Sequence, residues 1–125
     1  MENKDKQLLI KDLCARLPYE VKGLHRGEIQ RLLIMDSFGS YQVNGYSAWF
    51  ELNSVNFKPY LRSMSSMTEK EKEEHEMFFH SYSTSLDERK SVERIDWLNE
   101  HHFDYRGLIS MGLALEAPED MYKTE

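Results

Sequence analysis

Apolar residues recur at helical spacing near the start of the chain, with Lys, Asp and Arg between them. This pattern predicts a helix over residues 5–17, and Pro18 marks its end because proline cannot continue the backbone hydrogen bonding. Cys14 lies beside the apolar stripe, so we expect a small buried side chain rather than a nucleophile. The apolar positions of the stripe are Leu8, Leu9, Leu13 and Leu17.

Residues 19–62 have the residue pattern of a β-rich region. Glycine becomes frequent, and the apolar period shortens towards two, as in half-buried strands. Short strands joined by tight turns predict a small antiparallel sheet or an SH3-like, partly open barrel. Asn44-Gly45 is the sharpest hairpin signal, because both central positions of a two-residue turn favour positive φ. The expected strands are Tyr19–Leu24, Glu28–Met35, Tyr41–Val43, Ala48–Leu52 and Val55–Leu61.

The helical pattern returns in residues 68–118. Thr68 is a good N-cap, and Glu71 three residues later completes a capping box. We expect this helix to reach about His80, with its charge run as a solvated face. After a polar break at 81–85, a third helix is predicted from Leu86 or Asp87 to Asn99.

The last part of the chain carries weaker signals. Residues 105–114 are apolar enough for one more short helix, although Gly107 and Gly112 interrupt it. Residues 119–125 have the composition of a frayed tail. The predicted fold is therefore α+β, with an N-terminal helix, a small sheet and two to three C-terminal helices.

Length and composition favour one globular domain covering residues 1–125. The chain has 40% hydrophobic and 30% charged residues, which is an ordinary globular balance. Its formal net charge of −6 does not favour binding to a phosphate backbone. A single cysteine, no apolar leader and no run of about 20 apolar residues predict a cytoplasmic protein outside the membrane.

Signatures of catalysis are missing from the sequence. There is no glycine-rich phosphate loop, no nucleophile elbow and no Cys-x-x-Cys, so we expect no cofactor. His75 and His80 are five residues apart, whereas a zincin helix needs four. On a regular helix the two rings would point about 140° apart.

A second group of candidate ligands is His101, His102 and Asp104. Adjacent residues on a helix point in different directions, although a helix end relaxes that limit. The simpler interpretation is a hydrogen-bonded histidine and a cation that favours the helix C-terminus. A metal-dependent hydrolase that uses these three residues is one alternative function.

Basic and aromatic residues also alternate near the end of the sheet and again near residue 105. Lys58, Tyr60 and Arg62, with Tyr105 and Arg106, have the combination that stacks on nucleic-acid bases. On a chain of net charge −6, solvated strand ends are the simpler interpretation. We therefore expect a protein partner rather than nucleic acid.

Four stretches of the chain are similar to one known pattern. They are KDLCARLPY (11–19), FKPYLRSMSSMT (57–68), HHFDYRGLI (101–109) and LEAP (115–118). In this order they resemble a family of small uncharacterised proteins from gut anaerobes, often found among phage and mobile-element genes. That family often has proline at the position of Ser63. The resemblance implies no activity and no catalytic residue, but it favours accessory proteins that act by binding.

The leading hypothesis is therefore a non-enzymatic interaction protein of phage or mobile-element origin. Large flat side chains dominate binding hot spots, so exposed aromatics are the first candidates, although Trp49 and Tyr60 also suit a core. A third alternative is an acidic nucleic-acid mimic with Glu69, Glu71, Glu73, Glu74 and Glu76 in place of phosphates. Met111 and Leu115 could form a homodimer contact. The candidate binding residues are Tyr46, Trp49, Tyr60, Arg62, Tyr105 and Arg106.

Overall fold

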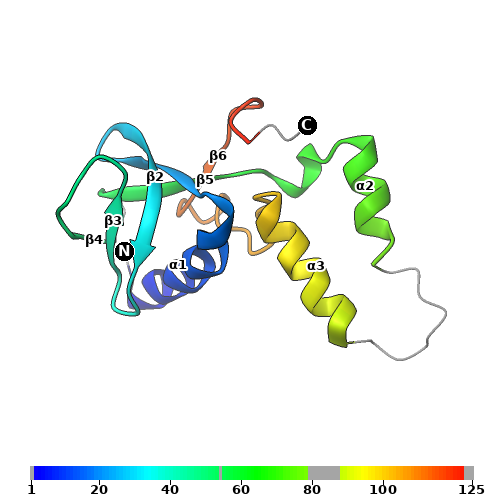
Figure 1. Cartoon of the computed structure of the whole chain (residues 1–125), viewed down its shortest axis with the longest axis horizontal. Helices are drawn as coiled ribbons and strands as arrows, with labels where there is room; N and C mark the ends of the chain where they lie inside the picture. Colours follow the sequence, from blue (N-terminus) through cyan, green and yellow to red (C-terminus); the bar gives the residue numbers. More distant parts are fainter. Residues whose placement is uncertain (1, 54, 79–87, 123–125) are drawn as a thin grey trace.

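A computed structural model describes residues 2–53, 55–78 and 88–122 of the chain. It has the predicted α+β architecture, in which an N-terminal helix and a sheet precede two further helices (Figure 1). The elements are α1 (Asn3–Arg16), β1 (Lys22–His25), β2 (Glu28–Met35), β3 (Ser40–Val43), β4 (Phe50–Glu51), β5 (Phe57–Leu61), α2 (Glu69–Glu76), α3 (Glu88–Glu100) and β6 (Leu115–Glu116). Short 3₁₀ turns follow α1 at Leu17–Tyr19 and precede α2 at Met64–Ser66.

The six strands form one open sheet in the order β4-β3-β2-β1-β5-β6. Neighbouring strands from β4 to β5 are antiparallel, whereas β6 runs parallel to β5. The parallel pair arises because the chain passes through α2 and α3 before it returns to the sheet, and parallel strands need such a crossover. The sheet is therefore mixed rather than purely antiparallel, and it does not close into a barrel.

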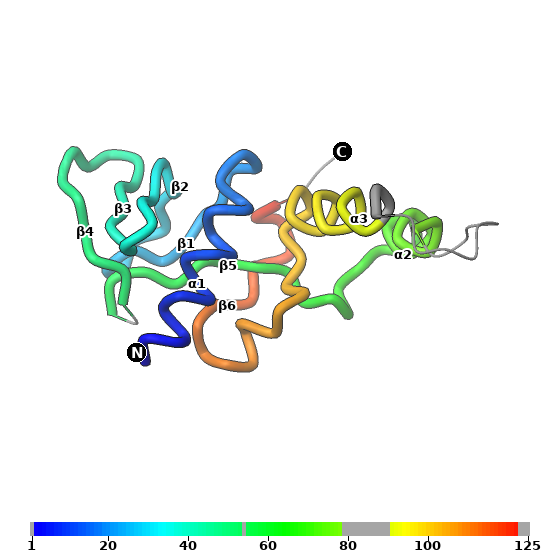
Figure 2. The backbone as a smooth tube through the Cα atoms, turned by 90° about the horizontal axis from the view of Figure 1, so that it is seen from below, coloured from blue at the N-terminus to red at the C-terminus, as the bar shows by residue number. Residues whose placement is uncertain are grey.

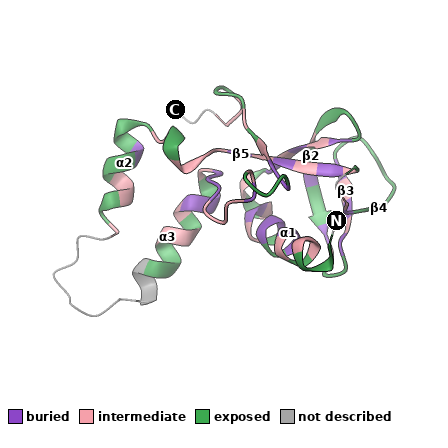
Figure 3. Cartoon of the chain, turned by 180° about the vertical axis from the view of Figure 1, so that it is seen from behind, coloured by how far each residue is buried: buried purple, intermediate pink, exposed green. Residues whose placement is uncertain are grey.

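Helix α1 covers one face of the sheet. Leu9, Ile10 and Leu13 are buried in a cluster with Leu32 of β2 and Tyr41 of β3 (Figure 3). The same cluster takes in the 108–114 segment, so two separate parts of the chain close this face. Removing apolar side chains from water on this scale is the main force that holds the sheet and helix together.

Two turns differ in kind. The β1–β2 hairpin turns at Arg26 and Gly27, which have φ of 49° and 91°, as a two-residue type I′ turn requires. Asn44-Gly45 is not such a hairpin, because only Gly45 has positive φ and six residues separate β3 from β4. Tyr46 N–H donates to Val43 O at 3.3 Å, so Gly45 occupies the third position of a wider turn.

A buried ion pair joins α1 to the segment that follows α3. Arg16 and Asp12 are fully buried, with Arg16 Nε 2.8 Å from Asp12 Oδ2. Arg16 Nη2 also donates to the carbonyl oxygen of Phe103 at 2.6 Å. Arg106 Nε reaches the second Asp12 oxygen at 3.1 Å, and the Tyr105 ring lies under both guanidinium groups. We call this arrangement the arginine joint.

The arginine joint fixes how residues 102–104 extend the sheet. Arg62, just after β5, donates its N–H to His102 O and accepts from Asp104 N–H, both at 2.7 Å. Phe103 pairs with Arg62 in a parallel bridge, and the Arg62 guanidinium lies 4.2 Å from the Phe103 ring centroid. The region after α3 is thereby held beside the end of β5.

Helices α2 and α3 lie side by side beyond the end of the sheet opposite β4 (Figure 2). The predicted capping box is confirmed, since Thr68 Oγ1 accepts from Glu71 N–H and Glu71 Oε1 accepts from Thr68 N–H. Glu71 also forms two hydrogen bonds of 2.7 Å with Arg62. Trp97 of α3 stacks on His75 and donates its indole N–H to Glu74 at 3.1 Å.

The end of the chain differs from the sequence expectation. Among residues 105–114 the structure has turns instead of the predicted short helix, because Gly107 and Gly112 adopt φ of 77° and 76°. The prediction of a frayed tail is wrong for Met121 and Tyr122, which are partly buried. Cys14 is exposed rather than buried. The predicted end of the second helix at His80 and the break at 81–85 lie outside the described residues.

We predict that Asp12→Asn lowers the free energy of unfolding by about 3–5 kcal/mol, because it leaves the buried Arg16 charge without its carboxylate. Urea denaturation of the purified protein measures this change. The matched control is Glu51→Gln, which breaks the more exposed pair with Lys6 at 3.1 Å and should cost about 1 kcal/mol or less. Equal effects of the two substitutions would contradict a central role for the arginine joint.

Candidate functional site

The face of the sheet opposite α1 is exposed. In β5 the residues Phe57, Pro59 and Leu61 are buried, so strand alternation turns Lys58 and Tyr60 to the other face. Leu24 of β1 lies on the same side, and its cross-strand partners are Ile29 and Lys58. We call this surface the open face: it comprises Lys22, Leu24, Ile29, Arg31, Leu33, Ile34, Lys58 and Tyr60.

A β-bulge enlarges the apolar part of the open face. The pairing of β2 with β3 slips by one residue between Leu32 and Ile34. Leu32 and Met35 therefore both stay buried, while Leu33 and Ile34 between them are 43% and 45% exposed. Together with Ile29, which is 54% exposed, β2 presents three exposed aliphatic side chains. Exposed apolar clusters of this kind mark interaction sites.

On β1, β2 and β5 the charged residues of the open face are the cations Lys22, Arg31 and Lys58. Lys22 and Arg31 are cross-strand partners, and Lys58 projects from β5. Arg31 Nη1 lies 3.2 Å from a Glu20 carboxylate oxygen. Both side chains are largely exposed, and ion pairs of this kind contribute little to the free energy of folding. Three of the sixteen Lys and Arg residues of the chain thus lie on the face of the sheet that α1 leaves uncovered.

The aromatic residues predicted to bind a partner differ in exposure and in position. Trp49 is 51% exposed, so the interpretation of this residue as core is wrong. It lies just before β4, whose Phe50 packs against the core. Tyr46 is 41% exposed, and its hydrogen bond of 2.9 Å to Glu28 raises the pKa of its hydroxyl. Tyr60 is half-buried on the open face.

The remaining predicted binding residues lie elsewhere. Arg62 is held by Glu71, and this hydrogen-bonded pair lowers the pKa of the Glu71 carboxyl to about 2. Tyr105 donates its hydroxyl to Asn99 at 2.9 Å, and Arg106 belongs to the arginine joint. The structure does not bring these three residues together with Trp49 and Tyr60.

The candidate metal ligands point to separate partners. His101 Nδ1 lies 2.9 Å from the Trp97 carbonyl oxygen, so this nitrogen carries the proton and donates. Both Asp104 oxygens accept backbone N–H groups, from Leu108 and Ile109. Across the described ranges, no group of three His, Cys, Asp or Glu side chains could hold a metal ion. The arrangement therefore does not favour the metal-dependent hydrolase, and His80 lies outside the described residues.

The acidic helix α2 is not a uniformly solvated face. Glu71 is buried against Arg62, and Glu74 accepts the indole N–H of Trp97. Glu69 accepts a hydrogen bond of 3.3 Å from Lys72, so three of the five carboxylates that a nucleic-acid mimic would use are engaged within the molecule. This geometry weakens the mimic hypothesis.

A polar cleft of about 590 Å³ lies between α2, the end of α3 and residues 116–122. The Arg62–Glu71 pair and His101 line it together with several further carboxylates, among them Glu74, Glu100 and Glu116. The excess of carboxylates would suit a cation, but the charges of Arg62 and Glu71 in the cleft already neutralise each other. No local pattern predicts this cleft, because its walls come from three distant parts of the chain.

Comparison with known proteins gives no relative. No family model, no curated protein and no solved structure matches the chain. In the parts of the chain that the structure describes, every helix is too short or too polar to cross a bilayer.

His102 is the buried histidine of the segment beside β5. Burial, followed by the nearby charges of Arg16 and Arg62, lowers its pKa from 6.5 to about 4. Its Nδ1 has no hydrogen-bond partner among the described residues, and its ring stacks on Tyr122 at 3.7 Å. His102 is thus a neutral packing group, and its protonation opposes folding.

We predict that acid destabilises the protein through His102. The unfolded chain takes up the proton near pH 6.5 and the folded chain only near 4, so stability falls as pH drops through this interval. A shift of this size corresponds to about 3 kcal/mol. His102→Asn, a residue that tolerates the positive φ of this position, should flatten the urea-derived stability profile between these pH values.

Glu71→Gln is the matched control for the pH profile. The pKa of Glu71 is lowered from 4.5 to about 2, so its contribution is lost only as pH falls below 4.5. The two variants should therefore change different parts of the curve. A His102→Asn profile that keeps the wild-type slope between pH 6.5 and 4 would contradict the assignment.

Proposed function

We propose that this protein is a non-enzymatic interaction protein, and that its open face binds an acidic, apolar segment of a protein partner. The observation that carries the proposal is the exposed aliphatic group of Ile29, Leu33 and Ile34 beside the cations Lys22 and Arg31. An apolar surface stabilises a complex by leaving water, and the cations select partners that carry carboxylates.

Charge also argues against a symmetric dimer through this face. A two-fold contact places each patch against its own copy. Lys22, Arg31 and Lys58 of one subunit would then face the same cations of the other, which is unfavourable. Homodimerisation through Met111, which is 46% exposed, and Leu115, which is half-buried in β6, stays a separate prediction.

Two further expectations remain proposals. A cytoplasmic location is supported by the single cysteine, which fits a reducing compartment. An origin among phage or mobile-element proteins of gut anaerobes rests on the resemblance of four sequence stretches. The hydrolase and mimic alternatives have weaker support, because their residues are engaged in contacts within the chain.

Peptide display tests the proposal. Random peptides selected on the wild-type protein should be rich in Asp, Glu and aromatic or aliphatic residues. Ile29→Asp should weaken the selected peptides at least about tenfold, because it removes apolar contact and adds a repelling charge. The matched control is Val92→Asp on α3, which is similarly exposed at 60% and should leave binding unchanged.

Several outcomes would overturn the proposal. Selected peptides that are rich in Lys and Arg would contradict it, as would equal loss of binding in both variants. Binding of a single-stranded oligonucleotide that is abolished by Ile29→Asp would assign the face to nucleic acid instead. Failure to select any peptide would also reject the open face as a peptide-binding surface.

A further inference from the structure

The backbone pairing of β1 with β5 ends one residue pair earlier than its register would allow. The last pair is Gly23 with Pro59, so the next pair in register would be Lys22 with Tyr60. These two residues do not pair with each other. Instead, the hydroxyl of Tyr122 accepts from Lys22 N–H at 2.9 Å and lies 2.8 Å from Tyr60 O and 3.1 Å from Lys22 O. The Tyr122 hydroxyl thus takes the place of one backbone pair of the sheet, and we call this position the filled rung.

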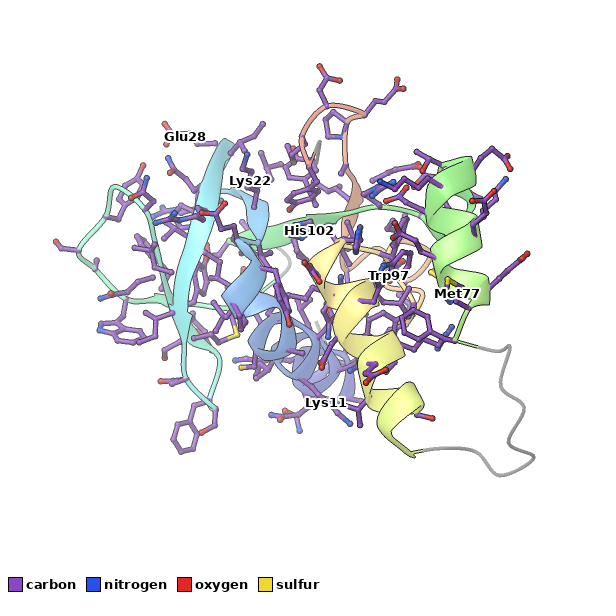
Figure 4. All side chains as sticks on the ribbon, turned by 45° about the vertical axis from the view of Figure 1, so that its right-hand side comes forward. Lys11, Lys22, Glu28, Met77, Trp97 and His102 are labelled. Atoms are coloured by element: carbon purple, nitrogen blue, oxygen red, sulfur yellow. The ribbon has the colours of Figure 1, made fainter. Side chains whose placement is uncertain are left out.

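The filled rung is a well-defined slot for a phenol. The Tyr122 ring stacks on His102 with an angle of 15° between the planes. Burial raises the pKa of Tyr122 to about 12, so the hydroxyl stays protonated and can donate to a strand carbonyl. Figure 4 shows Lys22 and His102 near the C-terminal segment that supplies this ring. The single hydroxyl hydrogen donates to one carbonyl at a time, with Tyr60 O at 2.8 Å nearer than Lys22 O at 3.1 Å, while the hydroxyl oxygen accepts from Lys22 N–H.

The segment Pro118–Tyr122, which we call the strap, is attached through few polar contacts. Besides the Tyr122 hydroxyl, Lys22 Nζ approaches Met121 O at 3.5 Å. Met121 N–H bonds within the strap to Pro118 O, while Pro118, Glu119 and Asp120 are exposed. The base of the strap is held separately, because Ala117 N–H donates to Leu61 O at 2.7 Å. The strap can therefore leave its slot without disturbing β6.

The strap has the chemistry proposed for the external partner. Its sequence is Pro-Glu-Asp-Met-Tyr, two carboxylates followed by two large apolar side chains. Its tyrosine hydroxyl contacts the backbone of Lys22 and Tyr60, whose side chains belong to the open face. A segment of this composition is thus already seated at the border of the surface that we propose as the binding site.

We infer that the strap is a built-in competitor, and that a partner segment with acidic residues followed by a tyrosine enters the same slot when it displaces Tyr122. This inference rests on the proposed function for the class of partner. Exchange of one tyrosine for another conserves the hydrogen bonds to Lys22 and Tyr60 and the stacking on His102. Binding in trans is therefore opposed mainly by the high effective concentration of the tethered strap.

Fluorescence anisotropy with a labelled peptide, the strap sequence preceded by Glu116 and Ala117, tests the inference on the full chain. The Tyr122→Ala variant should bind this peptide at least about tenfold more tightly than the wild type, because its slot is vacant. A peptide with phenylalanine in place of the tyrosine should bind the variant less tightly. Equal affinity for variant and wild type, no binding to either, or indifference to the peptide hydroxyl would each overturn the inference.

A second measurement covers the case in which Tyr122→Ala does not fold. Tyr122→Phe keeps the stacked ring but removes the acceptor for Lys22 N–H, so the Lys22 amide should exchange with solvent faster while that of Leu24 is unchanged. Unchanged protection of Lys22 would overturn the role of the hydroxyl.

The two proposals fail in different ways. If Ile29→Asp abolishes binding of display-selected peptides while Tyr122 variants bind the strap peptide no better than the wild type, only the strap inference fails. If the strap peptide enters the vacant slot while Ile29→Asp has no effect on selected peptides, only the open-face proposal fails.

Discussion

The buried guanidinium of Arg16 fixes the position of α1 relative to the segment that follows α3. Arg16 is fully buried, which is costly for a charge unless it is paired and hydrogen-bonded. Its partners are Asp12 on the same helix and the carbonyl of Phe103, 87 residues away. Because the charge has to keep both partners, α1 cannot move independently of the segment that follows α3. That segment in turn flanks the end of β5 through Arg62.

This constraint decides which surface of the sheet is left for binding. The arginine joint fixes α1 and residues 108–114 over one face, where the apolar core forms. The open face lies on the other side, with exposed aliphatic residues on β2 and cations on three strands. Three cations flank the exposed aliphatic patch, and this combination is what supports the proposed binding of an acidic, apolar segment.

The regular elements could be predicted because their signals are local. The strand Glu28–Met35 and the capping box of Thr68 and Glu71 follow from side-chain alternation and from cap chemistry within a few residues. The bulge in β2 was not predicted, because all four residues of Leu32–Met35 are apolar and the run does not show which of them face outward. A break in strict alternation there is the signal that could have revealed the open face.

What could not be predicted depends on long-range pairing. Strand β6 has two residues, so its place beside β5 comes from the return of the chain and not from its own propensity. Tyr122 lies in a stretch with tail-like composition, yet its hydroxyl completes a rung formed by residues 22 and 60. Glu71 belongs to a charge run that is otherwise typical of a solvated face, and only the fold brings Arg62 to it.

The central claim is that the sheet exposes a ready binding face in the unbound protein. Hydroxyl-radical footprinting of the full chain, read out by mass spectrometry over a wide range of protein concentration, tests this most directly. We predict strong labelling of Ile29, Leu33, Ile34 and Trp49, weak labelling of Leu9 and Leu13, and no dependence on concentration. Protection of the open face, at all concentrations or as concentration rises, would contradict the account, because the face would then be covered by this chain or by a second copy.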